Sequence, residues 1–244
     1  MNHKIFLFPV ILSSIISALD VEIKTSSGIS TGYYSSGVLN WDDIPYAKPP
    51  VGNLRWKAPR KIANPNNILL AKDNNFCVQR PSGMGGSEGD GYFSGTEDCL
   101  YLDVKAPKEK SLKQLPVMLW IHGGGNTSGL KDLYDFSKMV KRHDVIVVTI
   151  NYRLGPFGWF THPAIQDLQS GLDKTSNFGT LDIIESLKWV QSNISLFGGD
   201  PKNITIFGES AGGHNVFSLL ASNEAKGLFH KAISQSGYTT TIQA

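Results

Sequence analysis

The chain has 244 residues, enough for one domain of ordinary size with an ample hydrophobic core. Its 41% of hydrophobic and 18% of charged residues are typical of a globular protein, and a formal net charge of +2 provides no electrostatic footprint for nucleic acid. The sequence has no repeat period, no long low-complexity tract and no cluster of His, Cys and Asp with metal-ligand spacing, so it implies neither a metal nor another cofactor.

The first residues have the pattern of a targeting segment. A short basic start is followed by an apolar stretch from Ile5 to Ile16 and by the small residue Ala18. This pattern predicts a signal peptide over residues 1–18, a mature domain from residue 19, and a secreted or periplasmic protein. The apolar stretch is too short and too interrupted for a membrane span. A first core strand or a retained anchor is the alternative interpretation.

The next stretch divides into a hairpin and an irregular segment. Two strand-like runs, residues 21–24 and 29–34, flank Ser26-Ser27-Gly28 and predict a small antiparallel hairpin. Residues 41–65 are rich in Pro and Trp, so we expect an ordered surface segment without regular structure, pinned by its aromatic side chains.

Cys77 and Cys99 are the only two cysteines. In an exported protein they predict a disulfide worth about 3 kcal/mol, although two unpaired buried thiols remain the alternative. Residues 82–95, between these cysteines, hold six of the 25 glycines. A mobile loop tethered at both ends would suit the rim of a binding cleft, but the same composition would also fit a floppy insertion.

From Leu100 onward, continuous apolar runs alternate with helical patterns. The predicted strands cover 100–104, 117–121, 145–150, 204–207 and 232–235, and the predicted helices cover 135–143, 178–194 and 213–221. This alternation indicates an α/β fold with a mainly parallel sheet covered by helices on both faces. In such sheets the chemistry lies at the carboxyl ends of the strands.

A G-x-S-x-G pentapeptide, Gly208 to Gly212, lies between the predicted strand 204–207 and the following helix. This is the context of a nucleophile elbow, a strained turn that holds the serine hydroxyl clear of the backbone. Side chains at the two glycines would collide with the neighbouring strand and helix. Ser210 is therefore the candidate nucleophile, at the N-terminus of a helix whose dipole favours negative charge.

A second glycine-dense turn follows the apolar strand 117–121. In His122-Gly123-Gly124-Gly125, consecutive residues without side chains would let backbone N–H groups converge on a tetrahedral oxyanion. The amide of Ala211, the residue after the nucleophile, would supply a further donor. A plain turn or a phosphate cradle is the alternative, although no G-K-[ST] follows, which disfavours a P-loop. We expect His122 to orient this turn rather than to act as a base.

These features resemble the type B carboxylesterase, or cholinesterase-like, family of α/β-hydrolases. The matching stretches occur in the family's order and cover roughly residues 21–238; they are residues 97–104, 122–125, 151–155, 197–201, 208–213 and 233–237. The resemblance implies that Ser210 is acylated, that the amides of Gly124, Gly125 and Ala211 form the oxyanion hole, and that Cys77–Cys99 is the family's first disulfide. It also implies that Glu209 is a buried, hydrogen-bonded residue without a catalytic role.

The chain departs from this family in three respects. The family's triad acid and histidine follow the serine at a distance, whereas no Asp follows Ser210 here and only His214 and His230 do. We therefore expect residues 19–244 to be the incomplete, N-terminal part of a longer enzyme, with little turnover on their own. Asn126 stands where an aromatic or small residue is more usual. The loop between the cysteines contains no Trp, which disfavours choline esters.

Two functions follow from the resemblance. The first is a serine hydrolase of small carboxylic esters that works through an acyl-enzyme on Ser210 and needs no cofactor. The alternative is a non-catalytic cholinesterase-like binding or adhesion module, which the retained serine and glycine turn disfavour. The sequence indicates neither the oligomeric state nor the acyl preference.

Overall fold

A computed structural model describes residues 21–72, 75–86, 92–109, 111 and 113–239. The predicted signal peptide lies outside these residues. The described strands are β1 (Val21–Lys24), β2 (Ile29–Ser35), β3 (Val38–Pro45), β4 (Tyr101–Pro107), β5 (Leu115–Ile121), β6 (Ile146–Ile150), β7 (Gly199–Glu209) and β8 (Lys231–Gln235). The helices are α1 (Ser137–His143), α2 (Gly155–Gly158), α3 (Pro163–Gln166), α4 (Phe178–Asn193) and α5 (Ala211–Ala221).

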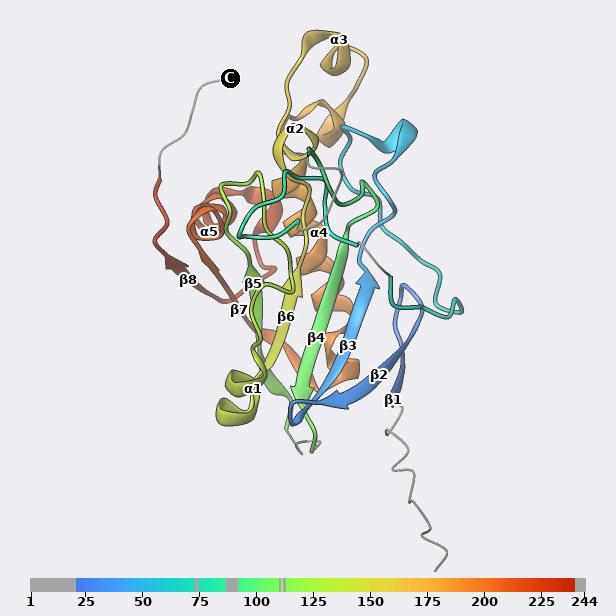
Figure 1. Cartoon of the computed structure of the whole chain (residues 1–244), viewed down its shortest axis with the longest axis vertical. Coiled ribbons are helices and arrows are strands. Elements are labelled where there is room, and N and C mark those ends of the chain that lie inside the picture. The colour runs from blue at the N-terminus through green and yellow to red at the C-terminus, as the bar shows by residue number, and fades with distance from the viewer. Residues whose placement is uncertain (1–20, 73–74, 87–91, 110, 112, 240–244) are drawn as a thin grey trace, which may run out of the picture.

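The strands form one eight-stranded sheet in the order β1-β2-β3-β4-β6-β5-β7-β8 (Figure 1). The pairs β6–β5, β5–β7 and β7–β8 are parallel, and every pair from β1 to β6 is antiparallel. The α/β class and the N-terminal hairpin β1–β2 are confirmed. The sheet is mixed, however, and the predicted parallel arrangement is confined to β6, β5, β7 and β8.

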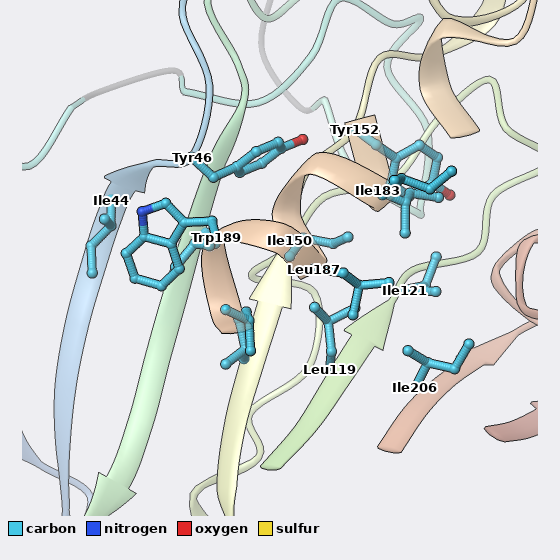
Figure 2. Close-up of a cluster of buried hydrophobic side chains, with 14 of the residues drawn as sticks. Ile44, Tyr46, Leu119, Ile121, Ile150, Tyr152, Ile183, Leu187, Trp189 and Ile206 are labelled. Carbon is cyan, nitrogen blue, oxygen red and sulfur yellow. The ribbon is translucent and has the colours of Figure 1, made fainter. Parts of the chain in front are cut away.

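Helices cover both faces of the sheet because the strands alternate their side chains between two cores. Leu187 and Trp189 of α4 pack over Leu119, Ile150 and their neighbours on one face (Figure 2). Val140 of α1 packs with Val147 on the opposite face. Every residue of β6 and the last three residues of β5 are buried, as the mainly apolar sequence pattern predicts.

The prediction for residues 41–65 was wrong at its start, because β3 extends to Pro45. Asp43 has a φ of 58°, and the pairing with β4 shifts register between Trp41 and Ile44. This bulge accommodates a sequence that looks turn-like, since pairing along β4 outweighs local preference.

Beyond Pro45 the stretch contains one short 3₁₀ turn, Gly52–Leu54, and is pinned by aromatic side chains as expected. The Tyr46 hydroxyl donates to the Asn151 carbonyl oxygen at 2.7 Å, and Trp56 stacks on Phe160 with ring centroids 5.2 Å apart. These contacts connect the segment to the loops at the carboxyl ends of the parallel strands.

Candidate active site

Two turns leave neighbouring parallel strands at the same end of the sheet. Ile121, the last residue of β5, lies opposite Gly208 in β7. The chain from His122 and the chain from Ser210 therefore begin side by side. Register alone brings together the two motifs, which are far apart in sequence.

Ser210 occupies the turn between β7 and α5 with φ 55° and ψ −119°. Residues other than glycine rarely adopt this region, so the backbone is strained at a single half-buried serine. The Ser210 amide donates to the Gln235 carbonyl oxygen at 2.9 Å, and the His214 amide donates to the Ser210 carbonyl oxygen at 2.9 Å. Hydrogen bonds to β8 and within α5 thus hold the strained turn on both sides.

The pentapeptide glycines are required by close approach, as the motif predicts. A Cβ at Gly212 would lie 2.0 Å from the Ile121 carbonyl oxygen, and one at Gly208 would lie 2.6 Å from the Gly212 carbonyl carbon. Both distances are far below any real contact of a Cβ atom. The start of α5 therefore rests directly on the end of β5.

The glycine turn, the segment between His122 and Gly129, lies over Ser210. A Cβ at Gly123 would lie 3.3 Å from the Ser210 Cβ. Gly124 has a φ of 98°, and its carbonyl oxygen accepts from the amides of Thr127 at 3.1 Å and Ser128 at 3.0 Å. The Gly124 carbonyl oxygen thus accepts two hydrogen bonds from within the turn.

The amides of Gly124 and Gly125 donate to no acceptor among the residues that the structure describes. Ala211 is the first residue of α5, so its amide has no acceptor within the helix. These amides belong to two segments that are in contact, since a Cβ at Gly123 would lie 3.3 Å from the Ser210 Cβ. Amides without an acceptor are donors of the kind that an oxyanion hole uses.

His122 is buried beneath the turn and is electrically neutral at neutral pH. Its ring stacks on Tyr152 with centroids 4.4 Å apart, and Nδ1 lies 2.8 Å from the Gly123 carbonyl oxygen. Because that oxygen can only accept, Nδ1 carries the proton. Burial lowers the pKa of His122 to about 4, against a smaller raising effect of the hydrogen bond to Gly123. These contacts orient the turn.

The two histidines that follow Ser210 are engaged elsewhere. His230 Nδ1 accepts from the Ile204 amide at 3.1 Å, which ties the chain to β7. His214 Nδ1 lies 2.6 Å from the Tyr238 carbonyl oxygen. Neither contact involves Ser210.

Glu209 differs from the expectation for a buried, hydrogen-bonded carboxylate. It is half-buried, and no hydrogen bond joins its side chain to the part of the chain described here. Its Oε2 would lie 3.3 Å from a Cβ at Gly123, so it lines the underside of the glycine turn.

The Cys77–Cys99 disulfide is present, as predicted, and its loop reaches the glycine turn. Gln79 donates through Nε2 to the Gly129 carbonyl oxygen at 2.9 Å and accepts from the Gly129 amide at 2.8 Å. A hollow of about 390 Å³ lies between this loop and the glycine turn, lined in part by Phe93 and Thr127. Residues 87–91 lie outside the description; of the predicted loop 82–95, Ser82 and Phe93 line this hollow.

The sequence analysis missed a buried charged cluster behind this region. Lys131 Nζ lies 3.0 Å from Asp43 Oδ1, 2.9 Å from Asp103 Oδ2 and 2.8 Å from Asp132 Oδ2. Burial raises the pKa of Asp103 well above its ordinary value, against the lowering effect of the Lys131 ammonium. The one sequence feature that could have indicated this cluster is Asp103, a single carboxylate within the otherwise apolar run 100–104.

Among the described residues, no group of His, Cys, Asp and Glu side chains is arranged to hold a metal ion. Within the same residues, no helix has both the length and the apolar character needed to cross a bilayer.

The strand order, the strained serine turn and the facing glycine turn are those of an α/β-hydrolase. The solved structures that resemble the chain are esterases of that kind. A para-nitrobenzyl (PNB) esterase structure superimposes with a TM-score of 0.79 at 44% identity, covering 91% of this chain and 44% of that one. A carboxylesterase from Geobacillus stearothermophilus gives a TM-score of 0.74 at 38% identity, covering 87% of this chain and 42% of that one.

The model of the carboxylesterase family matches residues 20–243, and the chain belongs to this family. The para-nitrobenzyl esterase of Bacillus subtilis is 46% identical over 222 residues, which are 90% of this chain and 44% of the relative. The liver carboxylesterase of Sus scrofa is 37% identical over an alignment 262 residues long, gaps counted, which covers 97% of this chain and 45% of the relative. The chain thus spans less than half the length of these relatives.

Proposed function

We propose that the protein is a serine hydrolase of small carboxylic esters, with Ser210 as its nucleophile. The observation that carries the proposal is the strained serine at the start of α5, with the glycine turn directly over it. Membership of the carboxylesterase family supports the reaction class. The names of the relatives, para-nitrobenzyl esterase and liver carboxylesterase, support a carboxylic ester as the substrate.

In the proposed reaction the Ser210 oxygen forms a bond to the ester carbonyl carbon while its proton passes to a general base. The carbonyl oxygen becomes an oxyanion, which the amides of Gly124, Gly125 and Ala211 stabilise by about 3–4 kcal/mol for each donor. Collapse of this intermediate breaks the bond to the alcohol oxygen, which takes the proton from the base. Water then attacks the acyl-enzyme in the same way and releases the acid.

The general base of this scheme is not among the histidines described above, because His122 is buried and neutral and the other two are engaged elsewhere. We propose that the base is a histidine of the full-length protein that follows residue 244, because the chain spans less than half the length of its relatives. The scheme uses no metal or other cofactor.

We further propose that the protein is exported. The basic and apolar pattern of residues 1–18 is one ground, and the disulfide is the other, because such bonds persist mainly in oxidising compartments. N-terminal sequencing of the protein purified from its natural source should begin at Leu19, the residue after the expected cleavage point. An N-terminus at Met1 would contradict export by this route.

The test of the hydrolase assignment is labelling of the full-length protein with a fluorophosphonate probe. Ser210→Ala should abolish both the labelling and the hydrolysis of p-nitrophenyl acetate. Ser218→Ala is the matched control, since Ser218 lies on the same helix and its hydroxyl donates to the His214 carbonyl oxygen at 3.3 Å. That variant should label normally. A wild-type protein that neither labels nor turns over ester, yet binds a partner protein, would favour the adhesion module instead.

A further inference from the structure

One side-chain pair joins the two segments of the site. Asn126, the residue after Gly125, accepts at Oδ1 from Asn215 Nδ2 at 2.9 Å. Asn215 is only 2% exposed and lies on α5, one helical turn after Ala211. Residues four apart lie on the same face of a helix, so the Asn215 amide reaches out from the face that carries Ala211.

Asn126 is suited to this contact by its backbone. Its φ is 57°, a left-handed conformation that asparagine tolerates better than most residues. Its carbonyl oxygen accepts from the Gly155 amide at 2.7 Å. The backbone of the turn is therefore held from the β6 side whether or not the Asn126 side chain is present.

Tyr152 links the Asn126 side chain to the other end of the turn. The Tyr152 hydroxyl lies 3.4 Å from Asn126 Oδ1, the atom that accepts from Asn215. The same hydroxyl donates to the His122 carbonyl oxygen at 2.6 Å. The Asn126 side chain thus lies between Asn215 on α5 and Tyr152, which holds the start of the turn at His122.

This linkage matters because the proposed oxyanion donors come from different parts of the chain. Gly124 and Gly125 lie in the turn after β5, whereas Ala211 begins α5. Strand pairing fixes where each segment starts, but residues 123–128 extend beyond the last strand pair. The hydrogen bond between Asn126 and Asn215 is a direct side-chain contact between that extension and α5.

We propose that Asn215, together with Asn126, is a positioning residue that sets the separation between the amides of Gly124 and Gly125 and the amide of Ala211. This inference rests on the proposed hydrolase function. Neither side chain needs to touch the substrate. A displacement of about 1 Å in such a site can lower the rate by about 100-fold, so loss of the linkage should lower kcat rather than weaken substrate binding.

The test uses Asn126→Gly, Asn215→Ala and the double variant in the full-length protein. Glycine keeps the left-handed backbone at position 126 and removes only the side chain. With p-nitrophenyl acetate we expect each single variant to lower kcat about 10- to 100-fold while KM changes less than about threefold. The double variant should be no worse than the worse single variant, because one linkage is lost in all three.

A trifluoromethyl ketone, which forms an oxyanion when the serine adds to it, separates positioning from folding. Its inhibition constant should rise by the same factor by which kcat/KM falls. Asn193→Ala is the matched control. Asn193 is also a 2% exposed helix asparagine, bonded to Ser26 and to the Trp189 carbonyl oxygen away from the site. It should lower the melting temperature but leave kcat within about twofold of wild type.

Three results would contradict the inference. The folded Asn126→Gly and Asn215→Ala proteins could keep kcat within about twofold of wild type, or the two reductions in kcat could multiply in the double variant. The third is a reduction of kcat in Asn193→Ala as large as that in the Asn126 and Asn215 variants. If Asn215→Ala does not fold, the kinetics of Asn126→Gly test the inference on their own, because the hydrogen bond from the Gly155 amide to the backbone of residue 126 remains in that variant. A wild-type protein that does not react with fluorophosphonate would instead defeat the hydrolase proposal itself, a result distinct from these.

Discussion

The buried histidine beneath the glycine turn makes the stability of the protein depend on pH in a defined direction. Burial lowers the pKa of His122 to about 4 from a reference of 6.5. Between pH 4 and pH 6.5, His122 is mostly protonated in the unfolded chain and mostly neutral in the folded protein. Stability is therefore full above pH 6.5 and falls as the pH is lowered toward 4. Integrated from pH 7 to pH 5, this difference amounts to about 2 kcal/mol.

The assay compares wild type with His122→Asn by urea unfolding, followed by tryptophan fluorescence at pH 7 and pH 5. The asparagine amide can replace Nδ1 as donor to the Gly123 carbonyl oxygen but does not titrate. Other groups titrate equally in both proteins, so subtraction isolates the histidine. We expect wild type to lose about 2 kcal/mol more than the variant over this interval. A difference below about 0.5 kcal/mol would show that the folded protein accepts the proton on His122, contrary to the burial argument.

Three further predictions concern stability. Gly212→Ala should prevent the native turn from forming, because its Cβ would lie 2.0 Å from a carbonyl oxygen of β5; expression yield and circular dichroism report this. Asp182→Ala should cost about 3–5 kcal/mol in urea unfolding, because it leaves the buried Arg153 guanidinium, bonded to Asp182 at 2.7 Å, without its partner. Replacing both Cys77 and Cys99 by Ala should cost about 3 kcal/mol by the same measurement.

Each of these has a result that would contradict it. A folded Gly212→Ala protein with wild-type melting temperature would mean that α5 can move away from β5. An Asp182→Ala protein within about 1 kcal/mol of wild type would show that water reaches Arg153. Full stability without the disulfide would mean that the loop between the cysteines is already restricted in the unfolded chain.

Much of the fold follows from local patterns in the sequence. The hairpin β1–β2, the apolar strands β5 and β6, and helix α4 appear close to their predicted residues. Continuous apolar runs of this length can be satisfied only by burial on both faces of a sheet, so the residues themselves carry the information.

The candidate site was partly visible for a similar reason. The two glycine-rich motifs are places where only residues without side chains fit, and the spacing of Gly208 and Gly212 reflects their contacts with β5 and with each other. A motif of this kind identifies a turn and its chemistry, but not the groups that hold it.

Only the tertiary structure determined the contacts between segments that are distant in the sequence. The strand β3 forms in a turn-like sequence because β4 offers it a partner, and the antiparallel half of the sheet follows from strand order rather than from composition. The hydrogen bond of Asn215 to Asn126 joins residues 89 positions apart, and that of the Tyr152 hydroxyl to the His122 carbonyl oxygen joins residues 30 positions apart. No local pattern signals such a pair, because a buried amide is recognisable only by the partner that folding brings to it.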